Sequence, residues 1–122
     1  MDDEVEARVR KICLALPESG EKETWGNPTF RVRNKIFASF GTVENPEGKT
    51  VHVMTMKAAP DEQESLLAEG HPFFYPRYVG SKGWIGVVLD DQTAWDEVAE
   101  LIEDSFREIA PKRVAALLDA GE

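Results

Sequence analysis

The 122-residue sequence is poor in the residues that build most reaction centres, with one cysteine, Cys13, and two histidines, His52 and His71. A single cysteine cannot form an internal disulfide, which is typical of a protein of the reducing cytoplasm. Neither histidine has a zinc-ligand spacing with Cys13 or with a carboxylate. We therefore expect no dedicated metal site and no cofactor.

The sequence also lacks an excess of positive charge and a long apolar run. It carries 14 basic and 23 acidic residues, a formal net charge of −9, which argues against a general binder of polyanions. Its longest apolar run, Trp84–Leu89, is far shorter than the about 20 residues that cross a bilayer. The acidic start lacks the order of a signal peptide. We expect a monomeric cytoplasmic protein with no membrane partner.

Catalytic motifs are missing as well. The serines (Ser39, Ser65, Ser81 and Ser105) lie in no nucleophile elbow. Gly80, Gly83 and Gly86 have neither P-loop nor dinucleotide-binding spacing. We predict no catalytic residue, so an enzyme ranks below a binding function.

What is present indicates one globular domain spanning residues 1–122, with 42% hydrophobic and 30% charged residues. Apolar residues at helical spacing predict helices over residues 3–16 and 94–110, with shorter ones over 61–69, opened by Pro60, and after Pro111. The residues from Glu18 to Thr24 have no strong pattern and are assigned to a loop.

Strands are predicted over 29–33 and 35–40, paired around Asn34, and over 50–57. A second hairpin joins 75–79 to 84–89 through Gly80-Ser81-Lys82-Gly83. The short connections indicate an α+β fold, a two-layer sandwich whose mostly antiparallel sheet has the N- and C-terminal helices packed on one face.

Charge follows these elements. The two strand-rich segments, 25–57 and 71–89, have net charges of +3 and +2, whereas 1–24, 58–70 and 90–122 have −3, −4 and −7. The strand-borne basic residues are a candidate nucleic-acid site, comprising Arg31, Arg33, Lys35, Lys57, Arg77 and Lys82. The alternative is that they only solvate the outer face of an antiparallel sheet.

Four aromatic residues, Trp25, Tyr75, Tyr78 and Trp84, suggest a second function. They could line a groove beside the sheet and bind a small ligand or another protein. The loop Gly80–Gly83 matches the G-x-x-G clamp of KH domains, but here it joins strands rather than helices, so a hairpin loop is favoured.

Several stretches together resemble the MmcQ/YjbR family. They are Leu16-Pro17, Trp25-Gly26-Asn27-Pro28-Thr29-Phe30-Arg31-Val32, Lys35-Ile36-Phe37-Ala38, Lys57 ahead of Pro60-Asp61-Glu62, Tyr78-Val79-Gly80-Ser81-Lys82-Gly83-Trp84, and Ser105-Phe106. The resemblance implies a CyaY-like (frataxin-like) sandwich and a DNA-binding protein with a double-wing motif, without an established reaction. The wings would correspond to hairpins such as 31–40 and 75–89.

The frataxin likeness also implies weak metal binding by the acidic N-terminal helix, through Asp2, Asp3, Glu4 and Glu6. A solvated helix start is the preferred interpretation of these residues. The sequence thus predicts DNA binding by basic hairpins, with a small-ligand or protein-interaction domain as the alternative.

Overall fold

The computed structural model describes residues 2–59 and 61–120, without the side chains of Asp2, Asp3 and Ala120. In chain order its elements are α1 (Asp2–Leu14), β1 (Ser19–Thr24), β2 (Asn27–Val32), β3 (Lys35–Glu44), β4 (Thr50–Lys57), α2 (Glu62–Glu69), β5 (Phe73–Phe74), the 3₁₀ helix η1 (Val79–Lys82), β6 (Trp84–Leu89), α3 (Trp95–Ile109) and α4 (Lys112–Ala120). Pro60, expected to open α2, lies outside the described residues.

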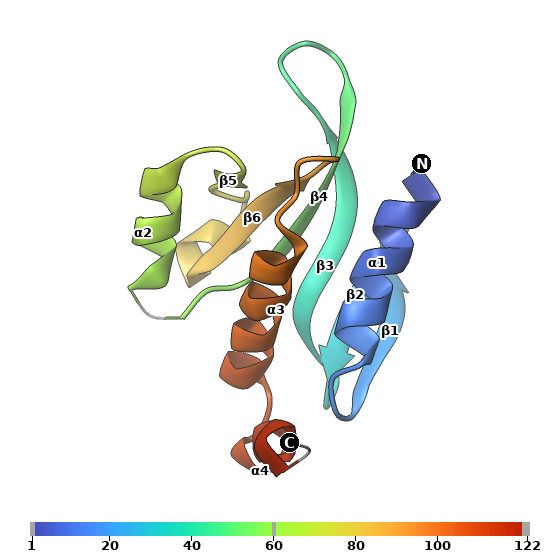
Figure 1. Cartoon of the computed structure of the whole chain (residues 1–122), viewed down its shortest axis with the longest axis vertical. Coiled ribbons are helices and arrows are strands. Elements are labelled where there is room, and N and C mark those ends of the chain that lie inside the picture. Colours follow the sequence, from blue (N-terminus) through green and yellow to red (C-terminus); the bar gives the residue numbers. More distant parts are fainter. Residues whose placement is uncertain (1, 60, 121–122) are drawn as a thin grey trace.

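The strands form one six-stranded sheet in the order β1-β2-β3-β4-β6-β5, and every neighbouring pair is antiparallel. Helices α1 and α3 lie across one face of this sheet, and α2 stands beside the β5–β6 edge (Figure 1). The predicted α+β class, with the terminal helices packed on an antiparallel sheet, is confirmed.

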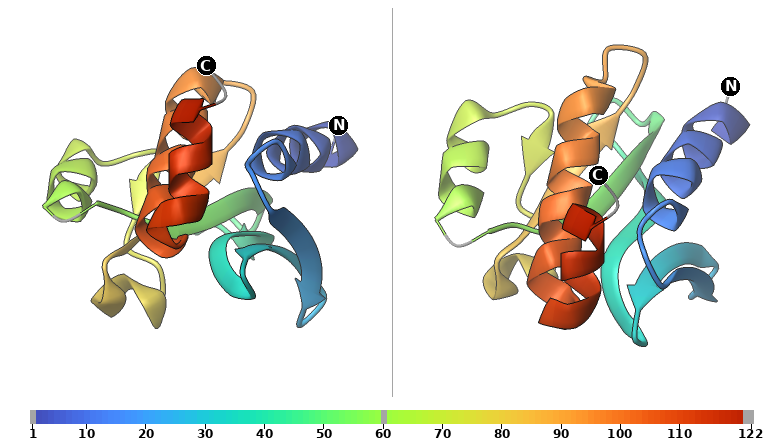
Figure 2. Two further views of the ribbon diagram at one scale, coloured as in Figure 1. Left: turned by 90° about the horizontal axis from the view of Figure 1, so that it is seen from below. Right: turned by 60° about the horizontal axis from the view of Figure 1, so that its bottom comes forward.

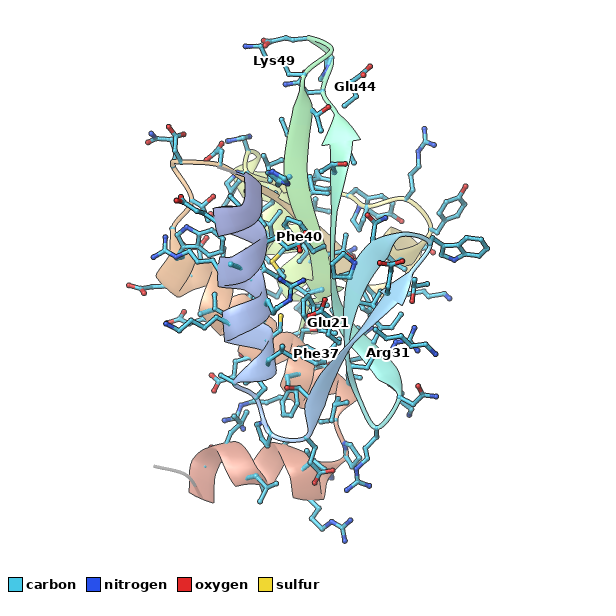
Figure 3. The ribbon with its side chains drawn as sticks, turned by 90° about the vertical axis from the view of Figure 1, so that its right-hand side faces the viewer. Glu21, Arg31, Phe37, Phe40, Glu44 and Lys49 are labelled. Carbon is cyan, nitrogen blue, oxygen red and sulfur yellow. The ribbon has the colours of Figure 1, made fainter. Side chains whose placement is uncertain are left out.

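Successive residues of a strand point to opposite faces of the sheet. Those that point toward α1 and α3 are mostly apolar along the inner strands, and they form the core between the sheet and the helices. Phe37 of β3 meets Phe106 of α3 edge to face, with ring centroids 5.4 Å apart. Figure 3 shows Phe37 and Phe40 on the helix side of the sheet and Arg31 on the other. Cys13 is fully buried in this core. Burial, with a smaller contribution from Glu21, raises the pKa of its thiol to about 12, so Cys13 acts as a small apolar residue.

A β-bulge interrupts the pairing of β2 with β3. Ala38 lies opposite Phe30 and Ile36 opposite Arg31, which leaves Phe37 as the extra residue. The buried hydroxyl of Ser105 on α3 donates to the Phe37 carbonyl at 2.6 Å and accepts from the Lys57 N–H at 2.8 Å. One side chain therefore ties α3 to two strands at the bulge.

Two predicted segments differ from the structure. Residues 18–24, assigned to a loop, contain β1, which pairs with β2 along its whole length. Residues 75–79, assigned to a strand, form bends that lead into η1, and only Phe73–Phe74 pairs with β6. The loop Gly80–Gly83 is accordingly the end of a 3₁₀ helix rather than a hairpin turn.

In the part of the chain that the structure describes, no helix combines the length and the apolar character needed to cross a membrane.

Candidate nucleic-acid interface

The sheet has an open face, defined here as the strand side chains that point away from α1 and α3. Residues paired across antiparallel strands share a face, and one row runs across the whole sheet through Lys22, Thr29, Ser39, Thr55, Gly86 and Phe74. Arg31, Lys57 and Trp84 lie on the same face, two residues from members of this row. Among the described strand residues, the open face therefore carries three cations, Lys22, Arg31 and Lys57, and no carboxylate.

Arg31 is fixed at the centre of a hydroxyl network. Its guanidinium donates to Thr29 Oγ1 at 3.2 Å and to Thr24 Oγ1 at 3.0 Å. The Thr29 hydroxyl in turn donates to the Lys22 carbonyl at 2.6 Å. These bonds orient a half-buried guanidinium on the open face while leaving its Nη1 group outside the network.

The segment 31–40, expected to be a wing, is the β2–β3 hairpin, which turns at Arg33 and Asn34. The neighbouring β1–β2 hairpin, Ser19–Val32, carries the exposed tip and is called the first wing here. Thr24 pairs with Asn27, so Trp25 and Gly26 form a two-residue loop, and both have positive φ, 56° and 81°. Such a loop is a type I′ turn, which matches the twist of the strands it joins. The Trp25 side chain at its tip is 96% exposed.

The second wing is the segment Phe73–Leu89, in which η1 and its approach stand out from the sheet. Figure 2 (left) shows the β1–β2 hairpin and the η1 segment at opposite edges of the sheet, both extending away from α3. Gln63 of α2 braces η1, because its amide donates to the carbonyls of Gly80 and Trp84, both at 2.7 Å. The Lys57 ammonium donates to the Lys82 carbonyl at 2.5 Å.

Glycine is required where the second wing closes on itself. The Tyr75 ring covers Gly80, and a Cβ at that position would lie 2.6 Å from the ring. Gly80 therefore keeps Tyr75 against the loop, where the Tyr75 side chain is still 56% exposed.

The six predicted basic residues are brought together only in part. Lys57 and Lys82 are in contact, Arg77 and Lys82 are exposed on the second wing, and Arg31 lies on the open face. Lys35 is exposed at the start of β3. Arg33 lies in the β2–β3 turn, where it donates to Glu18 at 2.7 Å.

The Arg33–Glu18 pair changes the charge available at that turn. The hydrogen bond from Arg33 lowers the pKa of Glu18 below its ordinary value and raises the pKa of Arg33. The positive charge of Arg33 is thus balanced within the protein, and Arg33 is the weakest of the six candidates.

The four predicted aromatic residues are exposed to different degrees. Trp25 and Tyr78 are almost fully exposed, Tyr75 is partly covered and Trp84 is half-buried. A cavity of about 730 Å³ lies between α1 and the Asp90–Trp95 loop, and one of about 150 Å³ lies beside His71 and Pro72. None of the four lines either cavity.

Acidic groups gather on the helices. The exposed face of α3 carries Asp96, Glu97, Glu100 and Glu108. Arg10 of α1 forms ion pairs with Glu6 and Glu21, and Arg107 of α3 forms ion pairs with Asp119 and Glu103. Among the described residues no three potential metal-ligating side chains come together, and the side chains of Asp2 and Asp3 lie outside that part of the chain.

Sequence reasoning missed two features of the candidate site, the β1–β2 hairpin that forms the first wing and the bracing of η1 by Gln63. The signal for the wing was the Trp25-Gly26 pair, since a two-residue loop ending in glycine is typical of a tight hairpin. No sequence pattern marks Gln63, because its role depends on α2 standing beside η1.

Solved structures of similar fold come from Pseudomonas syringae. A crystal structure aligns with a TM-score of 0.66 at 20% identity, covering 88% of this chain and 96% of that one. A solution NMR structure aligns with a TM-score of 0.61 at 21% identity, covering 88% and 90%. At such identity the likeness shows the fold alone, and no curated protein matches the chain significantly.

The family comparison is more specific. A family model described as YjbR matches residues 14–108, a span that begins inside α1 and ends inside α3, so that it contains both wings and the whole sheet. The resemblance recognised in the sequence is confirmed, and the chain belongs to the YjbR family.

Proposed function

We propose that this domain binds nucleic acid on the open face of its sheet, between the two wings. The observation that carries the proposal is the separation of charge between the faces. Lys22, Arg31 and Lys57 lie on the open face without a carboxylate among the described strand residues, whereas the acidic residues of α1 and α3 lie behind it. Those of α2 lie beside the β5–β6 edge.

This separation reconciles the proposal with the net charge of −9. Phosphate contacts are made by individual Lys and Arg side chains, and beyond about 10 Å at 0.1 M salt a carboxylate is largely screened. The acids on α3 lie across the core from the open face, so they weaken local attraction little while disfavouring binding of a polyanion to the helical side.

The basic residues have distinct roles in this proposal. Arg77 and Lys82 on the second wing are exposed and able to follow a phosphate backbone. Arg31 is held in place by the Thr24 and Thr29 hydroxyls, which suits it to a fixed contact at the centre. Lys57 uses one donor on the Lys82 carbonyl, and an ammonium has two more.

The test is a titration with labelled DNA by fluorescence anisotropy at about 50 mM salt and again at about 200 mM. We expect binding that weakens steeply with salt and is lost when Arg77→Glu and Lys82→Glu are combined. Both side chains are exposed, so this variant should fold normally by circular dichroism.

The matched control combines Lys112→Glu with Arg113→Glu, which adds the same negative charge on α4. We expect this control to bind within about threefold of the parent, because its charges lie away from the open face. Equal losses in both double variants would reject the interface, and an NMR titration at low salt that moves no amide resonance would reject nucleic-acid binding altogether.

A further inference from the structure

Two large aromatic side chains stand in solvent at the ends of the two wings. Trp25 on the first wing is 96% exposed and Tyr78 on the second is 87% exposed. Exposed apolar residues are common singly, but a tryptophan at a hairpin tip buries almost none of its large apolar surface. The fold therefore gains little packing from either ring.

The backbone at Trp25 is held where tryptophan is a poor choice. It occupies the first central position of a type I′ turn with φ of 56°. That position favours asparagine, aspartate or glycine, because other residues with a Cβ pay a steric cost at positive φ. The turn would thus form more readily with asparagine, and the indole is kept against local preference.

The backbone at Tyr78 is more unusual. Its φ and ψ are 64° and −58°, and the N–H of Val79 donates to the carbonyl of Arg77 at 2.6 Å. A three-residue turn with these angles is the rare, strained form of the γ-turn. Strain of this kind persists only where the surroundings enforce it, and it concentrates at ligand-binding sites.

Hydrogen bonds from neighbouring residues hold the backbone conformation at both tips. Thr24, directly before Trp25, is bonded to the Arg31 guanidinium. On the other wing, Gln63 holds the carbonyls of Gly80 and Trp84. The backbone that carries each exposed ring is therefore held by hydrogen bonds, so less conformational entropy is lost when a ligand binds.

We propose that the nucleic acid bound is single-stranded, with one base stacked on Trp25 and another on Tyr78 and the backbone crossing the open face between them. This inference rests on the proposed function and specifies its substrate. Bases in a duplex are stacked on their neighbours, whereas unpaired bases offer their faces to aromatic side chains. Duplex contact would need only the cations and would leave both rings without a role.

Two further strands, β3 and β4, lie between the strands that carry the two wings, β2 and β6. The axes of β2 and β6 are therefore about 14 Å apart, at about 4.8 Å for each strand spacing. In the strand register the Trp25 turn and Trp84, which follows η1, lie at opposite ends of the strands, so a strand bound to both wings would cross the open face diagonally. Ser39 and Thr55 on this floor bond to each other at 2.7 Å, and Arg31 lies on the same face. The floor is polar and suits a sugar–phosphate backbone.

The test compares four labelled probes of equal length by anisotropy at about 50 mM salt: an oligothymidine, an oligouridine, a duplex, and an abasic strand that keeps every phosphate and lacks the bases. We expect at least one of the two base-bearing single strands to bind more tightly than both the duplex and the abasic strand. Whichever of the two binds better identifies DNA or RNA as the source of the strand.

Four variants complete the test. Trp25→Asn and Tyr78→Gly should each weaken single-strand binding about 5- to 150-fold, the loss of one stacked base. Trp25→Tyr and Tyr78→Phe keep a ring and should bind within a few-fold of the parent. Trp25→Asn should also melt at a higher temperature, since it suits the turn, which separates lost binding from lost folding.

A matched control is Leu117→Asn, which removes another exposed apolar side chain, 46% exposed on α4, and should leave binding unchanged. Equal or tighter binding of the duplex or the abasic strand would overturn the inference, as would unchanged binding by Trp25→Asn and Tyr78→Gly together. If Arg77→Glu with Lys82→Glu still abolishes binding in that case, the proposed function stands. Absence of binding to every probe would reject both.

Discussion

Ser105 has a structural role that depends on a single hydroxyl. The bulge at Phe37 takes one backbone carbonyl out of the β2–β3 ladder, and Lys57 ends β4 with an N–H facing α3. Ser105, which is fully buried, satisfies both groups at once. An unsatisfied buried polar group costs about 1–3 kcal/mol, so this hydroxyl should matter more than its size suggests.

We predict that Ser105→Ala lowers the free energy of unfolding by about 2–4 kcal/mol, because two buried backbone groups lose their partner. Urea denaturation followed by circular dichroism measures the change. Ser65→Ala is the control, since the Ser65 hydroxyl is exposed and makes one long bond, 3.5 Å, to the carbonyl of Asp61 just before α2; its effect should stay within about 0.5 kcal/mol. Equal effects in the two variants would contradict the bridging role of Ser105.

Among the elements, the sequence predicts best those that bury a regular stripe. α3 follows its apolar positions because Val98, Ile102 and Phe106 face the core. β4 follows its alternation in the same way, with Met54 and Met56 buried. Periodicity reports burial on one side, and it is reliable where one side is indeed buried.

The elements that sequence reasoning missed have no such stripe. β1 reads Ser-Gly-Glu-Lys-Glu-Thr and is exposed along most of its length, so it exists because β2 offers hydrogen bonds and α1 offers Arg10. Conversely, Tyr75–Val79 contains strand-forming residues but leaves the sheet. Pro76 has no N–H to donate to a ladder, and the γ-turn at Tyr78 redirects the chain.

The residues of the candidate site were predictable where they lie on a regular strand, and not where they depend on tertiary contacts. Alternation along β2 places Arg31 on the face of the sheet away from the buried Phe30 and Val32, and the structure agrees. The exposure and strain at Trp25 and Tyr78 depend on tertiary bracing, which no local pattern encodes. Arg33, also a strand candidate, belongs to a turn and pairs with Glu18, which stands before β1, an element that was not foreseen.

One ion pair links two elements, α1 and β1, and gives the fold a defined pH dependence. Glu21 accepts from Arg10 Nε at 2.6 Å and from Nη2 at 2.9 Å. These hydrogen bonds lower the pKa of Glu21 below its ordinary value of 4.5. A lowered folded-state pKa adds stability above the unfolded value, and that stability is lost as the pH falls through the folded value.

We predict that Glu21→Gln destabilises the protein by no more than about 1 kcal/mol at neutral pH, because the pair is partly exposed and screened. The difference from the parent should shrink as the pH falls below about 4.5 and vanish once Glu21 is protonated in both states. Thermal melts across this range measure it. Glu23→Gln, on the same face of β1, is the control, and a difference that persists at low pH would show that packing rather than charge is lost.

At the scale of the whole molecule, the two faces of the sheet have opposite electrostatic character. The helical side carries the acidic groups of α1 and α3, and the open face carries cations. A charge distribution of this kind orients an approaching polyanion over the distance of a Debye length, about 10 Å at 0.1 M salt. It acts on the rate of association more than on the lifetime of the complex.

The last prediction follows from this separation. Glu100→Lys combined with Glu108→Lys reverses two exposed charges on α3, away from the proposed interface. We expect association with an oligonucleotide to become a few-fold faster at low salt, with little change in dissociation. Stopped-flow measurements between about 50 and 200 mM salt check this, and the gain should disappear toward the upper end because the Debye length falls to about 8 Å at 0.15 M.

Neutralisation serves as the graded control for that experiment. Glu100→Gln with Glu108→Gln removes the same acids without adding cations, so its effect should be about half as large and equally sensitive to salt. A gain that survives at high salt, or that slows dissociation, would mean that α3 touches the nucleic acid directly. The binding face would then be the helical one, and the separation of charge would have to be read as a solvated sheet backed by helices rather than as an interface.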